Sequence, residues 1–211
     1  MRLTAAGLTD AGRVREKNED AFFCGVDSGL FIVADGMGGK AGGETASKVV
    51  VTVLPTMLEH ATLGETEPRP AVARNALLSS LRRISDELCA QAEALPELAG
   101  LGAAVVVLFA EGGVGQVAWA GDSRAYLLRG KRLTQMTDDQ TTVAALVRAG
   151  HLTPDAARSH PLRHALEEFV GKQGKLNPGF RSRKLHARDR WLLCSDGVTK
   201  GISNESLGEL L

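Results

Sequence analysis

The pattern of apolar and polar positions divides the chain into strands, two helices and strands again. Near the amino terminus, short apolar runs bounded by turn residues predict a strand at 3–8 and a hairpin formed by 21–26 and 31–35. Apolar residues then recur at helical spacing in two long segments, 44–63 and 71–94. This spacing predicts two consecutive amphipathic helices.

The second half of the chain is rich in short apolar runs. They predict strands at 104–109, 114–120, 125–128, 180–185 and 191–194. Short helices are expected at 143–149, 154–158 and 204–211. Because the two long helices are consecutive and do not alternate with strands, the pattern favours an α+β fold with largely antiparallel sheets. A length of 211 residues is typical of one domain.

Composition indicates which kinds of partner the protein binds and in which cellular compartment it is expected. The formal net charge is +0, which gives no general attraction to nucleic acid or to an anionic membrane. The basic stretch at 181–190 is interpreted as a solvated strand face and turn, or as an attractor of phosphorylated substrates near an active site. The three cysteines have no CxxC spacing, the amino terminus has no apolar leader, and no apolar run is long enough to cross a bilayer. We therefore expect a cytoplasmic protein without a membrane partner.

Aspartates close three of the apolar runs. Asp35, Asp122 and Asp196 each follow such a run, and a further acidic pair, Glu19 and Asp20, lies near the amino terminus. A single Asp-Gly at a strand end is usually a turn former. Three of them together with the acidic pair favour a shared cleft, where grouped carboxylates repel one another unless cations lie among them. Oxygen ligands of this kind suit Mg²⁺ or Mn²⁺.

An arginine and a glycine-rich segment refine the chemistry. Arg15 precedes Asp20 by five residues, and its planar guanidinium suits a bidentate grip on a phosphoryl group, although a solvated surface arginine is the alternative. The segment 35–43 is not a Walker-type loop, because Ala34 and Ala41 stand where such a loop needs Gly and Ser or Thr. Two divalent ions close together activate one water. Metal with a phosphate clamp suggests hydrolysis of phosphomonoesters.

The order of four motifs resembles a known family. The motifs are GRVREKNED at 12–20, VADGMGGKAGGETAS at 33–47, AGDSRAYLLR at 120–129 and LLCSDGVT at 192–199. From the amino terminus to about residue 210, the chain resembles the metal-dependent Ser/Thr protein phosphatases (PPM, type 2C) in their bacterial form. The resemblance implies a single domain over 1–211, built as a β-sandwich of two mainly antiparallel sheets flanked by helices.

The same resemblance implies a two-metal centre at one end of the sandwich. By it, Asp35 bridges two Mn²⁺ or Mg²⁺ ions, Gly36 offers its carbonyl, Asp196 is a further ligand, and Asp20 holds a metal-bound water. Asp122 together with Asp196 is implied as the host of a third, weaker ion.

The implied activity is the hydrolysis of phosphoserine and phosphothreonine in proteins. Arg15 is implied as the group that binds the substrate phosphate. Phosphorylated proteins are the implied substrates, a Ser/Thr kinase is the implied partner in signalling, and a monomer is expected.

The sequence also departs from the family pattern. Members of the family end with a Gly-x-Asp-Asn-x-Thr segment and a last strand, whereas this chain stops at Leu211. Ala103 and Ala104 replace a typical Thr-Thr pair, and Gln140 replaces a typical His. We expect one metal site to lack a carboxylate and a sheet edge to lack a strand. Either the chain is a shortened form, or it is a degenerate member. The alternative function is accordingly a weak or inactive pseudophosphatase that binds phosphoproteins.

Overall fold

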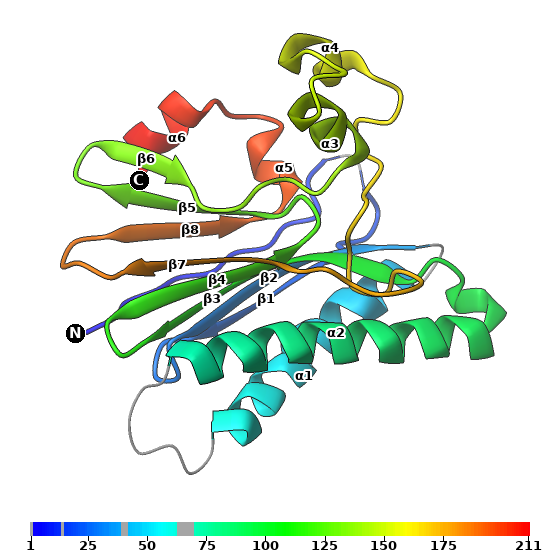
Figure 1. Cartoon of the computed structure of the whole chain (residues 1–211), viewed down its shortest axis with the longest axis horizontal. Helices are drawn as coiled ribbons and strands as arrows, with labels where there is room; N and C mark the ends of the chain where they lie inside the picture. Colours follow the sequence, from blue (N-terminus) through cyan, green and yellow to red (C-terminus); the bar gives the residue numbers. More distant parts are fainter. Residues whose placement is uncertain (1, 14, 39–41, 63–69) are drawn as a thin grey trace.

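Two antiparallel sheets pack face to face (Figure 1). The computed structural model describes residues 2–13, 15–38, 42–62 and 70–211. The larger sheet has five strands, in the spatial order β1 (Asp20–Gly25), β2 (Leu30–Met37), β3 (Gly102–Glu111), β4 (Val114–Ala120) and β7 (Gly179–Lys184). The smaller sheet has the order β6 (Arg132–Gln135), β5 (Arg124–Arg129) and β8 (Arg190–Cys194).

Two long helices cover the outer face of the larger sheet (Figure 1). They are α1 (Gly42–Thr62) and α2 (Pro70–Ala94). The shorter elements are η1 (Pro96–Leu98), α3 (Thr142–Arg148), α4 (Pro154–Ser159), α5 (Asp196–Thr199) and α6 (Asn204–Leu210). In the ranges that the structure describes, no helix combines the length and the apolar character needed to cross a membrane.

Strand β3 lies at the centre of two hydrophobic layers. Val105 and Val107 face the two long helices, whereas Val106 and Leu108 face the smaller sheet. Successive side chains of a strand point to opposite faces, so a strand buried on both faces is apolar throughout. This explains why the sequence has its longest apolar run here.

The pairing of the strands brings residues of all four sequence motifs to the same end of the sandwich. Asp35 pairs with Asp20 on one side and with Ala104 on the other, and the next residue of β3 pairs with Ala120 of β4. In the smaller sheet, Arg124 pairs with Cys194. We call this end of the sandwich the aspartate end. The opposite end, which holds the β1–β2, β3–β4, β5–β6 and β7–β8 turns, is called the far end.

The predicted architecture is confirmed, with three local differences. Residues 3–8 form no strand; their side chains are mostly exposed, and their backbone pairs with neither sheet. Strand β6 was not predicted, because four mostly polar residues at a sheet edge have no apolar period. Helix α5 was not predicted either, since four residues make only about one turn.

Candidate functional site

Asp20 and Asp35 are direct neighbours across two antiparallel strands. The backbone N–H of Asp20 donates to the side-chain oxygen of Asn18 at 3.0 Å, which fixes the start of β1. Ser195, at the end of β8, donates its hydroxyl to Asp20 Oδ2 at 2.7 Å. The larger and smaller sheets therefore meet at the carboxylate of Asp20.

Four carboxylates interact at the aspartate end. Burial, together with the neighbouring charges of Asp20, Asp196 and Asp122, raises the pKa of Asp35 to about 7. Burial, together with the charges of Asp196 and Asp139, raises the pKa of Asp122 to about 6. The structure thus brings together the four aspartates singled out in the sequence, in an arrangement that favours a cation among them.

Two glycines allow the backbone to pass close to these aspartates. Gly121 has φ +110, and a Cβ there would lie 2.6 Å from the Cβ of Ala104. Gly36 donates its N–H to the carbonyl of Glu19 at 3.1 Å, and a Cβ on Gly36 would lie 2.7 Å from that oxygen. A side chain fits at neither position, so these glycines set the path of the chain next to Asp122 and Asp35.

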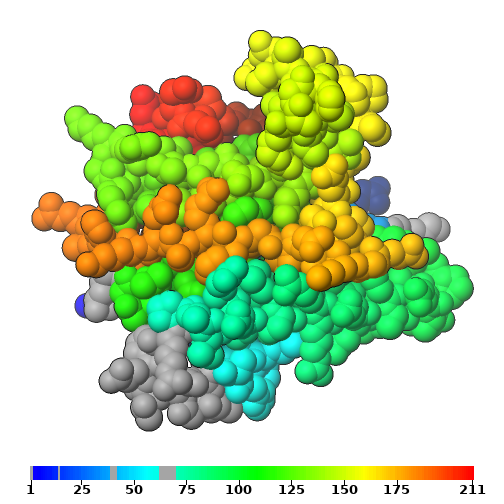
Figure 2. Space-filling model, in the orientation of Figure 1, coloured from blue at the N-terminus to red at the C-terminus, as the bar shows by residue number. Residues whose placement is uncertain are grey.

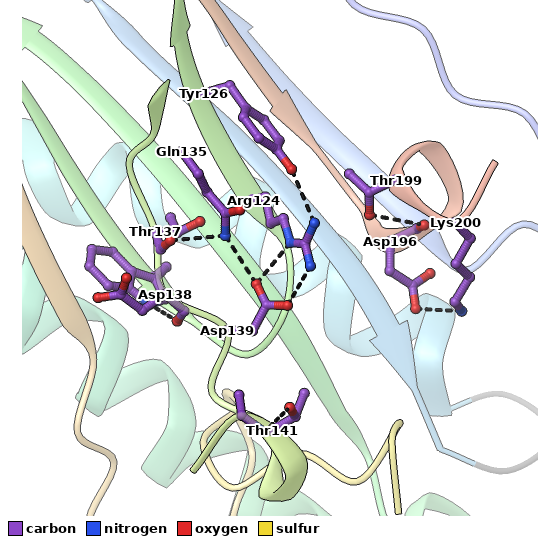
Figure 3. Close-up of polar contacts among 12 residues, drawn as sticks. Arg124, Tyr126, Gln135, Thr137, Asp138, Asp139, Thr141, Asp196, Thr199 and Lys200 are labelled. Carbon is purple, nitrogen blue, oxygen red and sulfur yellow. Dashed lines mark hydrogen bonds and ion pairs between the residues drawn. The ribbon is translucent and has the colours of Figure 1, made fainter. Parts of the chain in front are cut away.

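Asp196 is the first residue of α5 (Figure 3). Its Oδ2 lies 2.5 Å from Nζ of Lys200, one helical turn further along the chain. The negative carboxylate at the amino-terminal end of a helix is in a favourable position. The ammonium group of Lys200 offsets part of the negative charge at this end.

A second ion pair joins Arg124 to Asp139 (Figure 3), and the charge of Asp139 acts on Asp122. The guanidinium of Arg124 donates to both carboxylate oxygens of Asp139, at 2.8 and 2.6 Å, and to the hydroxyl of Tyr126 at 3.1 Å. Gln135 donates to the same carboxylate at 3.2 Å. The hydrogen bonds to Asp139 raise the pKa of Arg124 above its ordinary value. This network ties β5 to the segment that follows β6.

Arg15 lies on the segment that leads to Asp20. Its guanidinium pairs with the carboxylate of Glu19 at 3.2 Å, and 60% of its side chain is exposed. The structure therefore describes Arg15 as a partly solvated arginine with one acidic partner, four residues away. Its guanidinium stays accessible to a ligand in solution.

The donor set fits hard divalent cations that keep part of their water shell. Within the described residues, no three His, Cys, Asp or Glu side chains come together closely enough to hold an ion by themselves. The grouped donors at the aspartate end are carboxylates, and burial together with the charges of neighbouring carboxylates raises the pKa values of Asp35 and Asp122. Mg²⁺ and Mn²⁺ accept one or two carboxylates together with several waters, so this arrangement suits them.

The structure differs from the sequence-based predictions in the position of Asp35 and in two further residues of the site, and it leaves one segment untested. Asp35 lies inside β2, two residues before its end, and does not terminate the strand. Residues 39–41 of the glycine-rich segment lie outside the described ranges. Ser195 and Lys200 were not predicted as parts of the site. The spacing of Lys200 from Asp196 is a helical signal, whereas the bond of Ser195 to Asp20 depends on tertiary packing alone.

Comparison with known proteins gives the family. The model of the family described as "Protein phosphatase 2C" matches residues 11–209. The chain is 39% identical over 210 residues to the serine/threonine protein phosphatase PstP of Mycobacterium tuberculosis, covering 99% of this chain and 39% of the relative. It is 32% identical over 206 residues to the serine/threonine phosphatase Stp of Listeria monocytogenes, covering 96% of this chain and 81% of the relative. The chain belongs to the protein phosphatase 2C family.

A solved structure has the same fold. The catalytic domain of PstP, in complex with two manganese ions, superposes with a TM-score of 0.76 at 34% identity. The superposition covers 96% of this chain and 81% of that domain. By contrast, the chain spans only 39% of the full length of the mycobacterial PstP.

Proposed function

We propose that this chain hydrolyses phosphoserine and phosphothreonine in proteins with the help of two Mn²⁺ or Mg²⁺ ions. The observation that carries the proposal is the meeting of four aspartates from separate segments at one end of the sandwich. The names of the relatives, all serine/threonine or protein phosphatases, support the same activity. The manganese ions of the PstP catalytic domain support the choice of cofactor.

Their places in the site support the following roles for the proposed metal-binding residues. Asp35 faces the other three carboxylates and is the best placed to bridge two ions, with the carbonyl of Gly36 and the carboxylate of Asp196 as further donors. Asp122 and Asp196 together would hold a third, weaker ion. When bound, the ions lower the pKa of a coordinated water and neutralise charge on the phosphoryl group.

The remaining residues orient the reactants. Asp20, held by Ser195, accepts a hydrogen bond from the attacking water and aims it at phosphorus. Arg15 exchanges its bond to Glu19 for a bidentate grip on the phosphoryl oxygens, because its guanidinium is largely exposed. In these two roles the groups of this chain that act are the carboxylate of Asp20, the hydroxyl of Ser195 and the guanidinium of Arg15.

The biological setting is part of the proposal. Phosphorylated proteins are the substrates, and a Ser/Thr kinase supplies them. We further propose that residues 1–211 act as one domain, as a monomer in the cytoplasm and without nucleic acid. The formal net charge of +0 and the absence of a membrane-spanning helix among the described residues are compatible with this setting.

The test is phosphate release from a phosphothreonine peptide in the presence of Mn²⁺. Asp35→Asn should lower the turnover by about 100-fold or more, because it removes charge at the centre of the site. Asp27→Asn is the matched control, since Asp27 is exposed in the turn between β1 and β2 at the far end. Turnover by Asp35→Asn equal to that of the unmodified chain would refute the proposal.

The alternative is a pseudophosphatase that binds phosphoproteins without turnover. Calorimetry of the unmodified chain with Mn²⁺ and the same peptide distinguishes the two. Binding of the peptide with no release of phosphate would favour the pseudophosphatase.

A further inference from the structure

A pocket of about 270 Å³ lies between the two sheets, toward the far end. Its lining comes from β5, β6, the residue after β6, and β7: Leu127, Arg129, Arg132, Thr134, Met136 and Arg183. In Figure 2, β7 (orange) runs directly beside the β5–β6 hairpin (light green) on the viewed face. Both β6 and β7 are edge strands, so the pocket lies at the open side of the sandwich.

One of the three arginines is fixed in place. Arg129 donates from Nε and Nη2 to both carboxylate oxygens of Asp189, at 2.8 and 2.7 Å, and from Nη2 to the carbonyl of Lys184 at 2.8 Å. None of these bonds uses Nη1. The guanidinium of Arg129 is therefore oriented by its partners and retains donor capacity for a ligand.

Within the described part of the chain, the other two arginines have no acidic partner. Among the residues that the structure describes, Arg132 forms no ion pair, and Arg183 bonds only to the carbonyl of Ser182, at 3.4 Å. Arg181 lies two residues before Arg183 on the same strand. It differs from Arg183 because its guanidinium donates to the carboxylate of Asp138 at 3.0 Å and to the carbonyl of Met136 at 2.9 Å. Arg132 and Arg183 are exposed, so their positive charges are accessible to an anion in solution.

The pocket is separate from the site of the four aspartates. Arg124, beside the aspartate end, and Arg129 are the two ends of β5, and five residues of strand span about 16 Å. The charge of the chain as a whole is zero, so the excess of arginine is a local property of this face. The sequence interpretation of the basic stretch as an attractor near the active site is not supported, because Arg183 lies toward the far end.

We propose that this pocket binds a dianionic phosphate group. Guanidinium forks match the oxygens of a phosphate, and a tetrahedral dianion offers enough acceptors for Arg129, Arg132 and Arg183 at once. The hydroxyl of Thr134 adds a donor, and Leu127 with Met136 provides an apolar wall for an organic part of the ligand. The volume has room for a phosphate with a short organic group. The proposal does not depend on the hydrolytic function.

The test is an amide NMR titration of the full chain with inorganic phosphate, in saturating Mg²⁺ and at constant ionic strength. Saturable shifts are expected at Leu127, Thr134 and Arg183, separate from any shifts at the aspartate end. The double variant Arg132→Gln with Arg183→Gln should bind phosphate at least about 10-fold more weakly at this pocket. The double variant Lys131→Gln with Lys184→Gln removes the same charge from neighbouring positions outside the lining, and should change the affinity by less than about 3-fold.

Further arms identify the source of the phosphate group. A peptide with a non-hydrolysable phosphonate analogue of phosphothreonine that binds more tightly than inorganic phosphate indicates a phosphoprotein ligand, and equal affinity indicates free phosphate. Acetate should not saturate the same shifts. The proposal fails if phosphate shows no saturation, if acetate binds equally well, or if both double variants weaken binding equally. The single variants Arg132→Gln and Arg183→Gln decide the matter should the double variant not fold.

Discussion

Ser195 Oγ donates a hydrogen bond to Asp20 Oδ2 at 2.7 Å, although the two residues lie 175 positions apart in the chain. Asp20 begins β1 of the larger sheet, and Ser195 follows β8 of the smaller sheet. Ser195 is buried, so water does not compete strongly for its hydroxyl. The packing of the two sheets therefore brings Ser195 to Asp20, and the hydrogen bond between them orients the carboxylate of Asp20.

Removing this hydroxyl should lower the proposed activity without unfolding the chain. A hydrogen bond to a charged group contributes about 1.5 kcal/mol, so Ser195→Ala should reduce kcat about 10-fold. Steady-state hydrolysis of a phosphothreonine peptide with Mn²⁺ measures it. Ser28→Ala is the control, because Ser28 donates to the carbonyl of Gly25 at the far end, away from the aspartates. An unchanged kcat in Ser195→Ala would contradict a positioning role for Ser195.

The stability of the metal-free chain should fall as the pH rises. Folded Asp35 keeps its proton up to about pH 7, because burial and the other aspartates raise its pKa, whereas an unfolded aspartate releases its proton near pH 4. Between about pH 4 and pH 7 the folded chain therefore binds more protons than the unfolded chain, and the free energy of unfolding decreases as the pH rises.

Asp35→Asn should flatten this dependence. In EDTA at pH 8, the variant should be more stable than the unmodified chain by about 1–3 kcal/mol, because it lacks one of the repelling charges. Below pH 4 the two should be similar. Urea denaturation across this pH range gives the measurement, with Asp27→Asn as the variant that retains the slope. A variant as sensitive to pH as the unmodified chain would disprove the repulsion.

The sequence was sufficient for most of the fold because the buried strands are unambiguous. Strand β3 is apolar on both faces, and the α1 and α2 segments have one clear apolar face each, so periodicity defines them. Residues 3–8 have a strand composition but no partner strand in either sheet. A segment with strand propensity forms a strand only where a neighbouring strand can pair with it. The sequence of the segment alone does not show whether such a neighbour exists.

The site was predictable in part for the same reason. Asp35 and Asp122 adjoin apolar runs, so their position at a sheet end follows from the strands. The contact of Ser195 with Asp20 and the support of Arg124 by Asp139 depend on which sheets stack and in which orientation. No spacing along the chain encodes these contacts. The pocket around Arg132 and Arg183 could not be predicted from the sequence either, because it also depends on how the two sheets stack.

Replacing Lys200 should strengthen the binding of a divalent ion. Its ammonium lies 2.5 Å from Asp196 Oδ2 and competes with a metal for that carboxylate. Because the Lys200 side chain is half exposed, the pair contributes only about 0.2–1 kcal/mol, so Lys200→Met should tighten Mn²⁺ binding by at most about 5-fold. Calorimetric titration with Mn²⁺ measures the change. Arg83→Met removes a cation from a similar pair with Glu87 in α2 and should leave the affinity as it is. Weaker binding by Lys200→Met would contradict the competition.

A side chain at Gly121 should destabilise the fold more than a side chain at another glycine of positive φ. Gly121→Ala has both a backbone cost and a clash with Ala104, which together amount to about 2–4 kcal/mol of unfolding free energy. Gly113→Ala is the matched control, because Gly113 has φ +76 and no atom within 4 Å of an added Cβ. It should cost about 1–2 kcal/mol, from the backbone alone. Urea denaturation of both variants measures the difference. Equal costs would mean that Ala104 yields to the added methyl group, and that the close approach of β3 to Gly121 does not restrain Asp122.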